Sequence, residues 1–283
     1  MSSQVARVPE KSDLPNYAGE LAAFHQAFLP ELQALIAAVP LAPDMRVLDA
    51  GCGDGFYTGL FANRLLAPGA IVGVDISPAC IALARRRLAS RELRCEISLI
   101  AGDLAALPVP QAAFDLVWCA QSLYSLPDPV VALRQMSAAA KPGSLIAVFE
   151  NDTLHQVLLP WPCGLEIAIR AAEYAALHAR STRPGRYYVG RRLPAVLAEA
   201  GLEPLAFRTQ CIDRQAPIDP ALECFLRSYL QRLLGRVRSR LSREHLQELQ
   251  ELVDPTHGNY LLRQPHFTLS WLNVLAWGRK PLA

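Results

Sequence analysis

The chain has 283 residues, 52% of them hydrophobic and 19% charged, and its formal net charge at pH 7 is +2. This length accommodates one enlarged domain or a domain with a cap, and the apolar content is ample for a large core. A near-neutral charge provides no strong field, so we expect neither nucleic-acid binding nor stable membrane association. No stretch approaches the roughly 18 apolar residues that a membrane span needs.

The seven cysteines form no C-x-x-C pair and have no histidines nearby at the spacing of metal ligands. We therefore expect reduced, buried thiols and no metal site. The first residues contain no apolar core of the kind found in signal peptides, which favours a cytoplasmic protein.

Helices and strands alternate through the first half of the chain. Residues 18–39 have apolar side chains at helical spacing, and Pro30 suits the first turn of a second helix. Short apolar strands separated by helices of about a dozen residues are typical of βαβ units in a parallel sheet. The predicted strands are 46–50, 70–74, 97–100, 116–120 and 145–149, and the predicted helices lie near 56–66, 78–89 and 129–140.

The alternation changes after Phe149. We expect, in order, helices over 163–181 and 191–200, a strand over 205–212, a helical insertion over about 218–253 and a last strand near 267–276. Substrate specificity on such sheets usually comes from material beside the carboxyl ends of the strands. Residues 151–190 and 213–266 are therefore the predicted cap.

The helical insertion has two contrasting faces. Apolar side chains occupy one face at helical spacing, and the other carries Arg227, Arg232, Arg236 and Arg240. A basic amphipathic helix can lie on a membrane surface, which would suit a lipophilic quinone substrate. A cap helix with a solvated arginine face is the commoner arrangement, and we favour it.

The most informative segment is an apolar strand that ends in three alternating glycines, Gly51, Gly53 and Gly55, before a helix start. Glycines let the chain turn sharply and bring its backbone against a ligand, and the helix N-terminus presents free N–H groups. The next apolar strand ends in Asp75, where a doubly wound fold places a carboxylate that holds a ribose. The pattern indicates a site for a nicotinamide dinucleotide or for S-adenosylmethionine.

The position of the third glycine separates these two ligands. A dinucleotide fingerprint needs that glycine at position 56, where the helix packs close to the pyrophosphate, but the residue there is Phe56. S-adenosylmethionine has no pyrophosphate, so the helix need not approach so closely. Asp49, two residues before the turn, also fits an α-ammonium group better than two phosphates. The residues therefore favour S-adenosylmethionine.

Five ordered segments resemble the class I S-adenosylmethionine-dependent methyltransferases of the small-molecule type: 49–55, 74–78, 101–104, 114–117 and 141–144. The similarity covers residues 40–150 clearly and the final strands more loosely. It implies an α/β fold with a doubly wound, mostly parallel seven-stranded sheet and a helical cap. It also implies helices over 1–40 that close over the cofactor, a cofactor-binding core over 41–150, and cap helices with the final strands over 151–283.

The resemblance places the methionine part of S-adenosylmethionine at the glycine turn and its flanks. The glycines would line that part, and Asp49 would hold its ammonium group together with the carbonyl of Cys119. The residues assigned to this part are Asp49, Gly51, Cys52, Gly53, Gly55 and Cys119.

By the same resemblance, the adenosine part lies at the ends of the second and third strands. Asp75 would accept hydrogen bonds from both ribose hydroxyls, and Ile76 would cover one face of the adenine. Asp103 would accept from the adenine amino group, and the N–H of Leu104 would meet a ring nitrogen. Tyr17 occupies a position that often closes over the cofactor in such enzymes.

Methyl transfer from a sulfonium is an in-line displacement, so the protein must chiefly align the acceptor atom with the methyl group. A hydroxyl acceptor usually also needs a base, which contributes about 10²–10⁴-fold. His155, which follows the fifth strand, is the main candidate because histidine titrates near neutral pH. A histidine bonded only to the backbone is the alternative. Glu150 is the reserve candidate, and Tyr124 is a candidate for substrate contact.

The sequence thus predicts methylation of an oxygen or nitrogen atom of a small, fairly apolar molecule, aromatic or a natural product, with S-adenosylhomocysteine as the second product. We expect a monomer or a homodimer. Two alternatives stay open. One is a C-methyltransferase of a quinone precursor, and the other is a cofactor-binding protein or non-methylating catalyst on the same fold.

Overall fold

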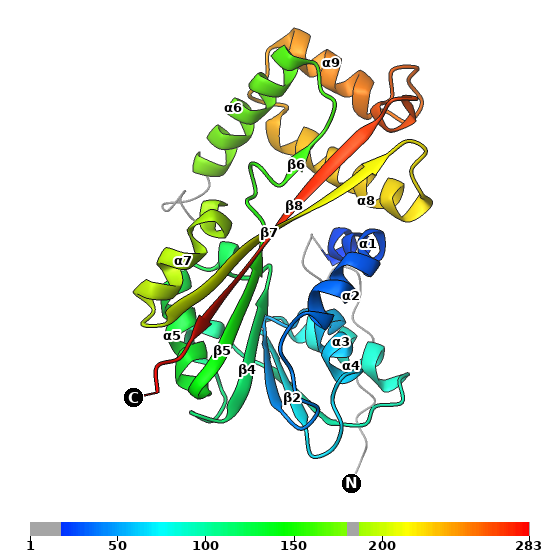
Figure 1. Cartoon of the computed structure of the whole chain (residues 1–283). Coiled ribbons are helices and arrows are strands. Elements are labelled where there is room, and N and C mark those ends of the chain that lie inside the picture. Colours follow the sequence, from blue (N-terminus) through cyan, green and yellow to red (C-terminus); the bar gives the residue numbers. More distant parts are fainter. Residues whose placement is uncertain (1–17, 180–186, 283) are drawn as a thin grey trace.

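The computed structural model describes residues 18–179 and 187–282 (Figure 1). Within these residues one mixed sheet has the strand order β3-β2-β1-β4-β5-β8-β6, and β7 also pairs with β8. Its parallel strands are β1 (Arg46–Ala50), β2 (Ala70–Asp75), β3 (Glu96–Ala101), β4 (Phe114–Ala120) and β5 (Ala140–Glu150). The antiparallel strands are β6 (Val157–Leu158), β7 (Glu203–Gln215) and β8 (Thr268–Arg279). The doubly wound, mostly parallel sheet is confirmed, with the two-residue β6 in addition to seven predicted strands.

Strand β5 begins earlier than the sequence indicates. Phe114 pairs with Ala140 and Leu116 with Leu145, so residues 140–145 contain a bulge. Gly143 has a φ of +77°, a conformation that glycine adopts without strain. The strand thus includes residues 140–144, which precede the predicted strand 145–149.

Helices cover both faces of the sheet (Figure 1). They are α1 (Ala18–Ala27), α2 (Leu29–Ala37), α3 (Phe56–Ala62), α4 (Pro78–Ala89), α5 (Pro129–Ala139), α6 (Cys163–Ala179), α7 (Val189–Glu199), α8 (Pro220–Val237) and α9 (Arg243–Val253). Pro30 lies in the first turn of α2, as predicted. The predicted helical insertion consists of two helices, because the Ser242 side chain accepts a hydrogen bond from the His245 N–H and starts a separate helix, α9.

Alternate side chains of the central strands pack into two separate cores. On one face Val47, Trp118 and Phe149 pack with α1, α2, α3 and α8, and on the other Val117 and Val148 pack with α5 and α7. This period of two is the geometry of a strand that is buried on both sides. The carboxyl ends of the strands therefore stay open between the two helical layers.

A long two-stranded ribbon carries the cap. Strand β7 pairs with β8 from Glu203–Arg279 to Gln215–Thr268, whereas β5 reaches only to Val274 of β8. The distal half of the ribbon extends beyond β5 and pairs with the short strand β6, and the chain between β7 and β8 forms α8 and α9 (Figure 1). Trp271 in this half packs against Phe24 of α1 and Phe225 of α8, with ring centroids 5.7 and 5.2 Å apart. The ribbon thus fixes the cap over the carboxyl end of the sheet.

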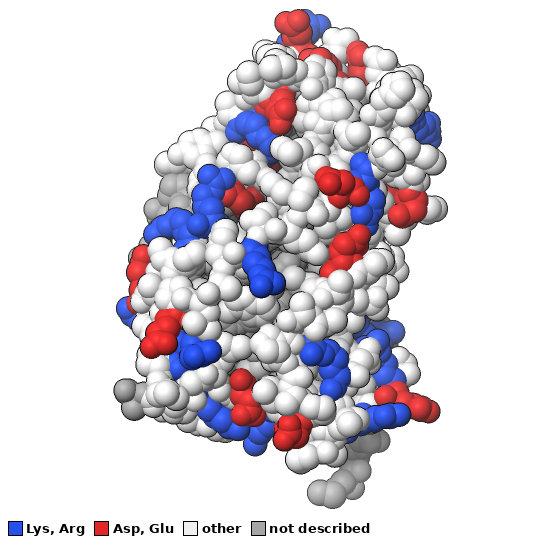
Figure 2. Space-filling view, in the orientation of Figure 1, with Lys and Arg blue, Asp and Glu red and all other residues white. Residues whose placement is uncertain are grey.

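The surface carries charges of both signs, and some of the cysteines are exposed on it. Lysines and arginines are interspersed with aspartates and glutamates on the face shown in Figure 2. No described helix is long and apolar enough to cross a membrane. The prediction of buried cysteines is confirmed only in part, because Cys163, Cys211 and Cys224 are exposed at helix and strand positions that face solvent.

Candidate functional site

The glycine turn after β1 leaves room for a ligand at its centre. Gly51, Gly53 and Gly55 all have positive φ angles, +82°, +53° and +76°. A Cβ on Gly55 would lie 2.9 Å from the Ala84 Cβ, so this glycine permits α3 to pack on α4. A Cβ on Gly53 would meet no described atom within 4 Å. Gly53 therefore presents bare backbone to open space, as expected of a residue against which a ligand lies.

Asp75 joins the end of β2 to this turn. Its Oδ2 accepts a hydrogen bond from the Gly53 N–H at 2.9 Å, and its Oδ1 accepts from the Ser77 N–H at 2.8 Å. Each carboxylate oxygen has about two lone-pair sites, so both retain capacity for a further donor. The neighbouring Ile76 side chain is 70% exposed, which is unusual for isoleucine. A carboxylate with spare acceptors beside a bare apolar side chain fits the predicted sugar and adenine contacts.

Asp49 is buried below the turn with one oxygen unsatisfied. Its side chain is 1% exposed, and Oδ2 accepts a hydrogen bond from the Thr58 hydroxyl at 2.6 Å. Oδ1 has no partner among the described residues. Burial raises the pKa of Asp49 to about 7. Because buried polar atoms are almost always satisfied, this oxygen fits a cationic donor such as the ammonium group of S-adenosylmethionine.

The other predicted cofactor residues lie at the same edge. Asp103 is exposed after β3, and its Oδ1 accepts from the Ala105 N–H at 2.8 Å. Leu104 is buried, and a Cβ on Gly51 would lie 3.6 Å from its Cδ1. Cys119 is buried near the end of β4. These residues cluster at the carboxyl ends of the strands on both sides of β1, where the strand order reverses. Cys52 in the turn is buried too. Tyr17 lies outside the described residues.

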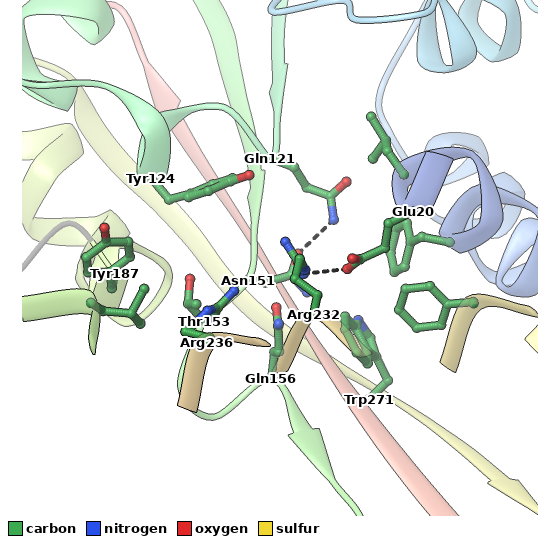
Figure 3. Close-up of a pocket in the computed structure, with 14 residues that line it drawn as sticks. Glu20, Gln121, Tyr124, Asn151, Thr153, Gln156, Tyr187, Arg232, Arg236 and Trp271 are labelled. Atoms are coloured by element: carbon green, nitrogen blue, oxygen red, sulfur yellow. Dashed lines mark hydrogen bonds and ion pairs between the residues drawn. The ribbon is translucent and has the colours of Figure 1, made fainter. Parts of the chain in front are cut away.

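A pocket opens beside this edge, beneath the cap (Figure 3). Its cavity volume is about 160 Å³, and the cavity opens to solvent. The apolar lining is Leu21, Phe24, Leu177, Phe225 and Trp271, and the polar lining includes Glu20, Gln121, Tyr124, Asn151, Arg232 and Arg236. The pocket is thus suited to a molecule with an apolar body and a few polar groups.

Hydrogen bonds between the side-chain amides of Gln121, Asn151 and Asn273 fix the orientation of the Gln121 amide. The Asn151 Nδ2 donates to the Leu272 carbonyl at 3.1 Å and to the Asn273 Oδ1 at 2.9 Å. A backbone carbonyl can only accept, so the Asn151 Oδ1 must face the other way, where the Gln121 Nε2 donates to it at 2.9 Å. The Gln121 Oε1 is consequently left buried and without a partner among the described residues. Gln121, which lines the pocket, therefore has an unsatisfied acceptor.

Glu150 supports the turn that carries Gln121 and Tyr124. Its side chain is fully buried, and its Oε1 accepts from the N–H groups of Ser122 and Leu123 at 2.9 and 2.6 Å. Burial raises the pKa of Glu150 to about 8. Glu150 does not line the pocket, whereas Tyr124 does. The geometry indicates that Glu150 positions the turn.

His155 lies outside the pocket lining, although Thr153 and Gln156 belong to it. Its side chain is 53% exposed. The Nδ1 atom is 2.8 Å from the Arg191 Nη2 and 3.4 Å from the Asp152 Oδ1. The structure thus brings Tyr124 to the pocket but not His155, whose role as a base stays a prediction.

The predicted solvated arginine face is correct for Arg227, Arg232 and Arg240, which are exposed, but not for Arg236, which is 16% exposed. Arg232 and Arg236 line the pocket, where Arg232 pairs with Glu20 and Arg236 pairs with Glu173. The sequence shows both arginines at helical spacing but not the direction in which the helix presents them. The available sequence signal was the presence of glutamates on two other helices, Glu20 on α1 and Glu173 on α6, which could pair with these arginines. Gln121 and Asn151 were missed as well, because isolated amides have no local pattern.

A parallel sheet reversed at β1, a glycine turn and a carboxylate ending β2 define the class I methyltransferase fold. Residues 41–180 match the family model of a methyltransferase domain. These residues are thus a methyltransferase domain of the class I S-adenosylmethionine-dependent type.

Solved structures have the same fold. The chain is similar to the YcgJ protein from Bacillus subtilis, with a TM-score of 0.56 and 14% identity over 89% of this chain and 99% of that one. It is also similar to the cyclase SpnF, with a TM-score of 0.51 and 21% identity over 89% and 81%. These likenesses concern the fold alone.

Curated relatives are similar over shorter stretches. The 27-O-demethylrifamycin SV methyltransferase of Amycolatopsis mediterranei is 31% identical over 65% of this chain and 64% of its own length. The demethylmenaquinone methyltransferase of Lactiplantibacillus plantarum is 32% identical over 44% of this chain and 52% of its own. The chain thus spans between half and two thirds of the length of these relatives.

Proposed function

We propose that this protein transfers the methyl group of S-adenosylmethionine to an oxygen or nitrogen atom of a small molecule held in the pocket beneath the cap. The observation that carries the proposal is the Gln121 Oε1, a buried acceptor without a partner among the described residues. An O–H or N–H group of a substrate would satisfy it. A carbon acceptor has no such donor.

The residues at the sheet edge would hold the cofactor beside this pocket. Asp75 would bind the ribose, Asp49 the ammonium group and Ile76 one face of the adenine. Bound S-adenosylmethionine supplies an activated methyl group, so the remaining task of the protein is alignment. The segment after β4 connects the two sites. Cys119, a predicted cofactor residue, lies near the end of β4, and Gln121 and Tyr124, which follow that strand, line the pocket.

The substrate proposed is fairly apolar, and the aromatic and aliphatic part of the lining supports this. A relative whose name refers to an O-demethyl compound matches 65% of this chain, which favours an oxygen acceptor. Relatives named for demethylmenaquinone keep quinone C-methylation as a second candidate. The fold does not decide between them, because one fold supports many chemistries.

The test is a methylation assay with labelled S-adenosylmethionine and a panel of phenols, alcohols and amines, with products analysed by mass spectrometry. We expect a product methylated on oxygen or nitrogen. The Gln121→Met variant should lower kcat/KM about tenfold, because methionine is similar in size to glutamine but lacks its amide acceptor and donor. Gln247→Met, at an exposed position on α9, is the matched control. Methylation on carbon, or equal rates in the Gln121 variant and the wild type, would contradict the proposal.

A further inference from the structure

Arg236 reaches the pocket from a buried ion pair. Its Nη1 donates to the Glu173 Oε1, and the two side chains are 16% and 2% exposed. An arginine has five N–H donors in a planar fork. Among the described residues Glu173 is the partner of Arg236, and the guanidinium lines the pocket (Figure 3). Donors of Arg236 are therefore left for a ligand.

Stability alone gives a weak reason for this pair. It joins α6 to α8, but apolar side chains of similar volume often stabilise such an interface equally well. Apolar side chains would not present N–H groups to the cavity. A buried carboxylate behind a guanidinium also restricts its rotamers, so less freedom is lost when a ligand binds.

The charged residues that line the pocket are two arginines and one glutamate. Arg232 and Arg236 contribute two positive charges, and Glu20 contributes one negative charge. Glu173, which holds Arg236, lies behind the lining. Both arginines are paired, but Arg232 is 44% exposed and its partner Glu20 lies in the lining, whereas Glu173 holds Arg236 from behind the lining. Arg236 is therefore the guanidinium better placed to receive an anion in the cavity.

We propose that the substrate carries a carboxylate that binds to Arg236, while its apolar body packs against Phe225 and Trp271 and its acceptor group faces Gln121. This inference rests on the proposed function, because it describes the same pocket. The fork of an arginine matches the two oxygens of a carboxylate. Because the Glu173 carboxylate already contacts Arg236, a monoanion suits this site better than a dianionic phosphate. The substrate class is thus an aromatic or other largely apolar hydroxy acid or amino acid.

The experiment compares each acid with its uncharged amide. A fixed panel of hydroxy acids and their primary amides, including para-hydroxybenzoate and para-hydroxybenzamide, is titrated into the full-length protein with S-adenosylhomocysteine present. We expect at least one acid to bind about tenfold or more tightly than its amide, as for a charged hydrogen bond in a largely buried site. Arg236→Gln should reduce this acid to the affinity of its amide. Arg227→Gln, on the exposed part of the same helix, should leave the preference unchanged.

The single variant leaves Glu173 buried without its partner, which can disturb folding. The double variant Glu173→Gln with Arg236→Gln removes both charges and should lose the preference for the acid in the same way. The inference is overturned if no acid in the panel binds better than its amide, or if the preference survives in the double variant. Failure of the proposed function would look different, because the acid preference would persist in binding while no acceptor became methylated.

Discussion

The two halves of the site are assembled in different ways. The cofactor half consists of the glycine turn after β1, Asp75 at the end of β2 and Asp103 after β3. Backbone N–H groups donate hydrogen bonds to both aspartates and hold them in place. The acceptor half consists of residues from α1, α8, the distal part of β8 and the segments after β4 and β5. Hydrogen bonds and ion pairs between side chains fix their positions. Backbone geometry thus shapes the first half, and long-range side-chain pairing shapes the second.

This difference predicts that the two halves respond separately to mutation. Changes at the sheet edge should alter cofactor affinity, and changes in the amide chain should alter substrate use alone.

Replacing Asp75 with alanine should weaken S-adenosylhomocysteine binding by about 100-fold or more. Two hydrogen bonds to a charged acceptor are lost, each worth about 1.5–3 kcal/mol, and the N–H groups of Gly53 and Ser77 lose their acceptor. Isothermal titration calorimetry measures the change. Asp115→Ala is the control, because that carboxylate pairs with Lys141 at the opposite end of β4. A loss smaller than about threefold would show that Asp75 does not hold the ribose.

The affinity for S-adenosylhomocysteine should rise about tenfold between pH 6 and pH 8. Asp49 has a pKa of about 7 in the free protein, so it holds a proton at pH 6 that an ammonium group must displace. Above this pKa the carboxylate is already ionised and the penalty disappears. Calorimetry in buffers of different ionisation enthalpy would detect the released proton. Asp49→Asn should remove the dependence, and a flat profile in the wild type would exclude contact between Asp49 and the ammonium group.

Asn151→Leu should lower kcat/KM for the methyl acceptor about two- to tenfold and leave cofactor affinity unchanged. The substitution removes the oxygen that orients the Gln121 amide, and one net hydrogen bond is worth about 0.5–1.5 kcal/mol. Steady-state kinetics and calorimetry on the same preparation separate the two effects. Asn259→Leu, at an exposed position, is the control. A parallel loss of cofactor affinity would mean that the two halves are coupled.

The sequence predicted the cofactor half because its signals are local. Three glycines and the acidic residue that ends the next strand lie within about 25 residues, and the parallel sheet places strand ends together. The five parallel strands were recognisable by their apolar runs, although the bulge at Gly143 was not. The acceptor half could not be read in this way. The Asn151–Leu272 hydrogen bond joins residues 121 positions apart, and the inward direction of Arg236 depends on how the β7–β8 ribbon orients α8.

The central claim is that a methyl donor at the sheet edge faces the pocket beneath the cap, and a crystal structure with S-adenosylhomocysteine tests it most directly. We expect the ribose hydroxyls within hydrogen-bond distance of Asp75, the amino group beside the Asp49 Oδ1, and the sulfur directed toward Gln121 and Tyr124. A ligand bound elsewhere, or a sulfur atom turned away from that pocket, would contradict the assignment of both halves.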